Sequence, residues 1–183
     1  MNAMTNRILL CAAVVIAMFI VGCEAPDTTI ANPQLTLPPQ EASPEYLDRV
    51  SSLNEVNEND AMRGLLMLIE GTDESQTFEQ RVFKLQAMNV VPSSWSFDAK
   101  RSLTRGKLAY MISQALDIRG GVVMMLAGPS QRYSLKELQF MGIMAPGATL
   151  TTVSGGEFVA VLARADAYRQ TGTVPEVLRA GGL

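Results

Sequence analysis

Residues 97–111 read FDAKRSLTRGKLAYM, a polar loop that runs into a helix start. Thr104 is a residue type that caps helices, because its hydroxyl accepts a hydrogen bond from a backbone N–H of the first turn. The stretch therefore predicts a loop followed by a helix over residues 104–117. Apolar residues recur along this helix every three or four positions, which places them on one face: Leu108, Met111, Ile112 and Ala115.

A similar helix–loop–helix pattern occurs a second time. Residues 85–91, LQAMNVV, align with residues 138–144, LQFMGIM, at an offset of 53, which makes Leu85 and Leu138 equivalent. Asn89 and Gly142, which tolerate the left-handed conformation, are predicted to end the first helix of each copy. The starts of the second helices align at an offset of 50. Chance similarity between amphipathic helices is the alternative explanation. If the repeat is real, two equivalent helix pairs are expected: residues 78–89 with 104–117, and 134–142 with 154–169.

Helix-start signals recur from Ser43 onward, whereas the alternation typical of strands is nearly absent. We therefore expect an all-α domain over residues 43–170, followed by a C-terminal tail over residues 171–183. A start at Asn57 would belong to a first unit over residues 44–70. Three capping boxes are predicted: Thr77 with Gln80, Ser134 with Glu137, and Ser154 with Glu157.

Residues 97–111, continued to Ala115 and Leu116, resemble the S-layer homology motif. In that family a helix ends in Gly-Ile or a similar pair, a loop carries Phe-x-Pro, and Thr-Arg-Ala-Glu opens a second helix. The resemblance covers residues 78–117 and, more loosely, 134–168. It implies repeated helix–loop–helix units, three of which pack into a helical prism. It also implies binding of cell-wall polysaccharide or modified peptidoglycan in grooves between the units.

The chain departs from this motif at several positions. Ala99 stands where the family carries Pro, Lys107 replaces the motif glutamate, and Gly155 stands where the arginine belongs. Trp95 lies in the loop instead of ahead of the first helix, and residues 118–133 have no counterpart in the motif. No unit therefore contains a complete Thr-Arg-Ala-Glu.

The composition excludes several classes of function. Of 183 residues, 48% are hydrophobic and 18% charged, which is typical of a folded domain. The net charge of −3 argues against a nucleic-acid partner. The chain has no histidine, which removes His-based catalysis and His-ligated metals. Its two cysteines, Cys11 and Cys23, both lie near the N-terminus.

The N-terminus has the pattern of a secretory signal. Arg7 precedes an unbroken apolar run of 14 residues, 8–21, which is short for a membrane-spanning helix. Ile20-Val21-Gly22-Cys23 resembles a bacterial lipobox. The resemblance implies that residues 1–22 are removed and that the Cys23 thiol carries diacylglycerol. An uncleaved signal anchor is the alternative. Residues 23–42 contain four prolines and are predicted to be an extended linker.

The candidate ligand site lies where the loop meets the helix start at Thr104. Arg105, in the first helical turn beside free N–H groups, would bind a carboxylate or a ketal acid. Trp95 and Phe97 would offer apolar faces to a sugar, and Arg101 would add positive charge. Each residue also has a structural interpretation: a solvated arginine at a helix end, a loop aromatic that closes the prism edge, or a solvated charged loop.

The sequence leads to one favoured function and two alternatives. The favoured function is a non-catalytic, cofactor-free envelope lipoprotein that binds a wall polymer, either peptidoglycan or acidic glycan, or an envelope protein. Acylated Cys23 would hold it on a lipid bilayer, facing the periplasm or the cell surface. One alternative is a structural or assembly lipoprotein without glycan affinity. The other is an enzyme that uses only carboxylates.

The lipobox resemblance yields a direct prediction. Mass spectrometry of the protein purified from a bacterial envelope should find Cys23 as the first residue, carrying at least two acyl chains, because one chain anchors only marginally. In a Cys23→Ser variant the signal should stay uncleaved. An intact N-terminus in the wild-type chain, or an unmodified thiol, would contradict the prediction.

Overall fold

The computed structural model describes residues 40–41, 44–121, 126 and 128–179, all within one compact unit, Leu37–Leu183. The predicted signal sequence, Cys23 and residues 24–39 of the predicted linker lie outside the described residues. Among the residues described, no helix combines the length and apolar character needed to cross a membrane.

The described chain is mostly helical, which confirms the all-α expectation at the level of fold class. The exception is a short antiparallel pair, in which Gln40 lies opposite Asp73 and Glu41 opposite Thr72, so the end of the predicted linker pairs with the domain. The elements in chain order are β1 (Gln40–Glu41), α2 (Pro44–Ser51), α3 (Glu58–Glu70), β2 (Thr72–Asp73), α4 (Phe78–Ala87), α5 (Arg105–Ala115), α7 (Gln131–Phe140), α8 (Gly155–Thr171) and the 3₁₀ helix η1 (Glu176–Leu178).

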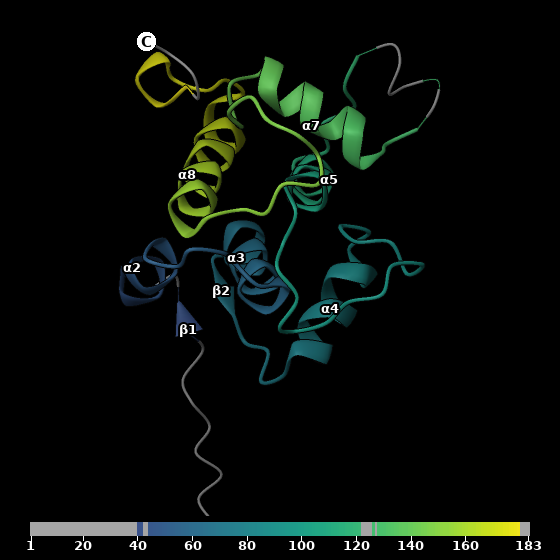
Figure 1. Ribbon diagram of the computed structural model, residues 1–183, viewed down its shortest axis with the longest axis vertical. Helices are drawn as coiled ribbons and strands as arrows, with labels where there is room; N and C mark the ends of the chain where they lie inside the picture. Colours follow the sequence, from purple (N-terminus) through teal and green to yellow (C-terminus); the bar gives the residue numbers. More distant parts are fainter. Residues whose placement is uncertain (1–39, 42–43, 122–125, 127, 180–183) are drawn as a thin grey trace, which may run out of the picture. The chain divides into compact units, whose positions relative to one another are not determined.

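The helices form three successive segments, α2 with α3, α4 with α5, and α7 with α8 (Figure 1). The second helix of each segment packs against the first helix of the next. Thus α3 contacts α4, α5 contacts α7, and α8 returns to α2. In addition, α3 touches both α5 and α8. The three segments therefore close into a cycle around a shared core.

A ring of backbone hydrogen bonds joins the three segments where their second helices begin. Val56 N–H donates to the Val153 carbonyl (2.9 Å), Val153 N–H to Leu103 (3.0 Å), and Leu103 N–H to Val56 (2.8 Å). All three side chains are fully buried. Because buried backbone groups need partners, the ring fixes the three loops relative to one another.

Each residue of the ring directly precedes a helix cap. The side chains of Asn57, Thr104 and Ser154 each accept a hydrogen bond from the N–H three residues later, as predicted for all three starts. The first N–H of each helix is also satisfied, by a carbonyl from another segment: Glu58 by Arg101, Arg105 by Thr151, and Gly155 by Leu53.

The repeat in the sequence has local counterparts in the structure. Leu85 and Leu138 are both fully buried. The Leu85 carbonyl accepts from the N–H groups five and six residues later, and so does that of Leu138. Asn89 and Gly142, which follow these helices, both have positive φ, 58° and 77°. The predicted left-handed helix ends are therefore confirmed.

Two boundary predictions are wrong. The helix predicted from Ser134 begins at Gln131, because Ser130 caps it and Ser134 lies buried within it. The domain also does not end at residue 170, since α8 continues to Thr171 and Val174 belongs to the core. The Thr77 capping box with Gln80 is confirmed.

A carboxylate spans the three loops beside the backbone ring and makes a pH-dependent contribution to stability. Glu55 accepts hydrogen bonds from the hydroxyls of Ser102 (2.6 Å) and Thr152 (3.0 Å). These bonds, that of Ser102 first, lower the pKa of Glu55 below its ordinary value. A lowered folded-state pKa stabilises the fold above the unfolded-state pKa, and this contribution is lost as pH falls through the folded-state pKa.

We therefore expect Glu55→Ala to lower the free energy of unfolding at neutral pH. The difference from wild type should shrink below about pH 4, near the unfolded-state pKa of a glutamate. Urea unfolding of the wild type and the variant between neutral pH and below about pH 4 measures this difference. Glu74→Ala, at an exposed glutamate, is the control. A difference that is constant with pH would show that the charge of Glu55 does not act through these bonds.

Candidate functional site

The first charged pair at the helix starts joins α3 to α5. Glu58, the first residue of α3, is fully buried, and its carboxylate lies 2.5 Å from Lys107 Nζ in the first turn of α5. The N–H of Asp98 donates to the same carboxylate (2.8 Å), and Arg101 Nη1 lies 3.9 Å away. Glu58 therefore ties the loop of the second segment to the first segment.

The second charged pair joins α5 to α8. Arg105 Nη2 lies 3.1 Å from Glu157 Oε1. Arg105 and Glu157 hold the same helix positions, first and third after the cap, as Glu58 and Lys107. The acid stands first and the base third in one pair, and the base stands first and the acid third in the other. Lys107 is complemented by an acid, Glu58, and Arg105 by the acid Glu157.

The third helix start has no such pair. Gly155 takes the first position of α8, and a Cβ there would collide with the Val50 carbonyl at the end of α2. Asp60, at the third position of α3, instead pairs with Arg49 of α2 (2.7 Å). The close approach of α2 therefore explains why this position is a glycine.

Arg105 is not placed as the sequence analysis expected. It is only 8% exposed, and its guanidinium donates to the carbonyls of Ala145 and Pro146 as well as facing Glu157. The backbone N–H groups of Arg105 and Gly106 are also not free, since they donate to the backbone carbonyls of Thr151 and Thr149. The expectation of an exposed arginine beside free N–H groups is therefore wrong. The loop of the third segment occupies the space predicted for a ligand.

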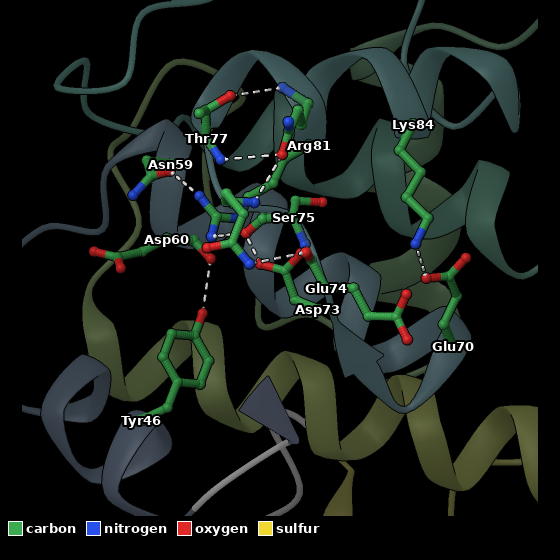
Figure 2. Close-up of polar contacts among 12 residues, drawn as sticks. Tyr46, Asn59, Asp60, Glu70, Asp73, Glu74, Ser75, Thr77, Arg81 and Lys84 are labelled. Carbon is green, nitrogen blue, oxygen red and sulfur yellow. Dashed lines mark hydrogen bonds and ion pairs between the residues drawn. The ribbon is translucent and has the colours of Figure 1, made fainter. Parts of the chain in front are cut away.

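A network centred on Arg81 holds α4 in position (Figure 2). Its guanidinium contacts Asp73 (2.5 Å), Asn59 (3.0 Å) and the Ser75 carbonyl (2.9 Å). Lys84, one turn later, pairs with Glu70 of α3 (2.5 Å). Because α4 lies between this network and the loop 92–103, these contacts fix one wall of the site described next.

The loop aromatic residues gather beside the first charged pair. The Trp95 ring lies 4.9 Å from that of Tyr110 and 6.1 Å from that of Phe97, both tilted. Lys107 Nζ lies 5.8 Å from the centre of the Trp95 ring and 5.3 Å from that of Phe97, within reach of cation–π attraction. Burial raises the pKa of the Tyr110 hydroxyl. Trp95 and Phe97 themselves are half-buried.

Trp95 separates two hollows in the surface. One, of about 380 Å³, lies between the loop, α5 and the start of α7. The other, of about 270 Å³, lies between the loop and α4. We call the two together the Trp95 groove. Its walls are formed by Pro92, Trp95, Tyr110, Pro129, Ser130 and Gln131 on one side and by Phe78, Glu79, Val82, Phe83, Gln86 and Phe97 on the other.

The predicted site residues thus separate into two groups. Trp95 and Phe97 line the groove, whereas Arg101 lines neither hollow and lies near Glu58. Thr104 serves as a helix cap and Arg105 as part of a buried pair.

The sequence analysis missed Tyr110, Gln131 and the buried Glu58. Tyr110 follows Lys107 by three residues, so helical spacing could have placed it beside the loop. Gln131 belongs to the next segment, and no local signal marks it.

Comparison with known protein families, with curated proteins and with solved structures gives no match for this chain. The site is therefore interpreted from its own geometry.

The position of Arg105 predicts a structural effect. Arg105→Ala should lower the free energy of unfolding by about 2–3 kcal/mol. This is less than the 3–5 kcal/mol typical of a broken buried pair, because the Glu157 side chain keeps 21% exposure. Urea unfolding measures the change. Arg119→Ala, in a pair whose side chains are both 83% exposed, should change stability by less than about 0.5 kcal/mol. Equal stability of the two variants would contradict the assignment.

Proposed function

We propose that this chain is a non-catalytic lipoprotein of the bacterial cell envelope whose helical domain binds a wall polymer through the Trp95 groove. The observation that carries the proposal is the groove itself. It places a half-buried tryptophan and a tyrosine 4.9 Å apart between two hollows. Aromatic rings with a polar edge bind ligands that have both apolar and polar faces, as sugars do.

We further propose that the three segments are degenerate S-layer homology units. The motif in residues 97–111 supports this, together with the ring through Val56, Leu103 and Val153 and the cyclic packing of the helices. One hollow of the groove lies where the second segment meets the third, and the family binds its polymer in grooves between units. In this proposal acylated Cys23 anchors the protein to the bilayer, and the linker lets the domain reach the wall.

A structural or assembly role without glycan binding is the second candidate. It is favoured by large apolar side chains that the structure leaves in solvent, Phe140 (88% exposed) and Leu150 (81%) among them. Aromatic side chains such as Phe140 are enriched in the cores of protein–protein interfaces. In this case an envelope protein, instead of a polymer, would be the ligand.

Co-sedimentation with purified sacculi separates the two candidates. The wild-type domain should sediment with the sacculi, and Trp95→Ala should bind about tenfold more weakly, the equivalent of about 1.4 kcal/mol. Phe140→Ala, which removes an exposed aromatic outside the groove, is the matched control and should bind as wild type. Thermal unfolding checks that all three are folded. No sedimentation of the wild type would favour the assembly role.

A further inference from the structure

We infer that the Trp95 groove takes an uncharged sugar that bears amide groups, such as an N-acetylated glycan, and not an acidic polymer. The inference rests on the proposed function and names the class of ligand. It departs from what the family motif implies, because the arginine that would bind an acid is buried in a pair with Glu157.

The walls of the groove carry no positive charge. The hollow between α5 and α7 is lined by apolar, aromatic, hydroxyl and amide side chains. The hollow beside α4 contains one charged side chain, the acid Glu79. An anionic ligand placed there would lose its hydration without gaining a counter-charge, which is unfavourable. An uncharged ligand does not have this cost.

Three cations of the loop and of the helices beside it already have partners within the protein. Lys107 Nζ lies over the rings of Trp95 and Phe97 and pairs with the fully buried Glu58. Arg101 donates to the Ser96 carbonyl and lies near the same carboxylate. Lys84 of α4 pairs with Glu70. Two exposed cations close in sequence to the lining residues, Lys100 and Arg132, line neither hollow.

The polar groups of the groove suit hydroxyl and acetamido groups. Among the described residues, no partner is found for the side-chain amides of Gln86 and Gln131 or for the Tyr110 hydroxyl. An amide side chain both donates and accepts, as an acetamido group does. Glu79 can accept from a sugar hydroxyl, and the Trp95 ring offers an apolar face between the two hollows.

Trp95 is the single tryptophan of the chain, so its fluorescence reports directly on the groove. We propose to titrate the domain with two probes: a hexamer of β-1,4-linked N-acetylglucosamine, which is uncharged, and a hexamer of galacturonic acid, which is anionic. The uncharged hexamer should change the Trp95 emission, with a dissociation constant that varies less than twofold between low and high salt. The anionic hexamer should leave the emission unchanged.

Variants test the assignment of the groups. Gln131→Ala should weaken binding of the uncharged hexamer about fivefold or more without changing thermal stability. The double variant Lys100→Gln with Arg132→Gln is the matched control and should bind as wild type, because these charges do not take part. Two results would overturn the inference: salt-sensitive binding of the anionic hexamer, or loss of binding of the uncharged hexamer in the double variant.

Parallel co-sedimentation with sacculi separates this inference from the proposed function. If the wild type sediments with sacculi but the uncharged hexamer leaves Trp95 unaffected, the ligand class is wrong while wall binding stands. If the wild type binds neither, both proposals fail.

Discussion

The backbone ring through Val56, Leu103 and Val153 is the constraint on which the rest of this structure depends. Its hydrogen bonds are buried and join residues that are far apart in sequence, so they form only when all three loops meet. Each ring residue directly precedes a helix cap. The ring therefore fixes where α3, α5 and α8 begin, and with them the side chains of their first turns.

Two charged pairs add contacts between the helices whose starts the ring brings together. Glu58 meets Lys107 and Arg105 meets Glu157 because the ring brings the first turn of one helix against that of the next. In the two pairs the acid and the base exchange helix positions, so both pairs keep opposite charges in contact. The same contacts place the groove, since Glu58 holds the Asp98 N–H and thereby the loop that carries Trp95 and Phe97.

The sequence predicted what local chemistry determines. Helix caps at Thr104 and Ser154 and the left-handed residues Asn89 and Gly142 depend on neighbouring residues, and the structure has them. The burial of Arg105 could not be predicted in this way, because residues 145–151, some 40 positions later, supply its partners. The pairing of Glu58 with Lys107 leaves one signal in the sequence. An acid follows the cap residue Asn57 directly, and a base stands three positions after the cap residue Thr104.

The central claim is that the helix starts interlock through these paired first turns, and exchanging one pair tests it most directly. Lys107→Glu alone places two carboxylates together at a buried site, and should cost about 3–5 kcal/mol of unfolding free energy. Adding Glu58→Lys should recover only part of that loss, because it also removes the acceptor of the Asp98 N–H, and should give a coupling energy of at least about 2 kcal/mol in urea unfolding. If the two changes are instead additive within about 0.5 kcal/mol, the pair does not link the segments and the account is wrong.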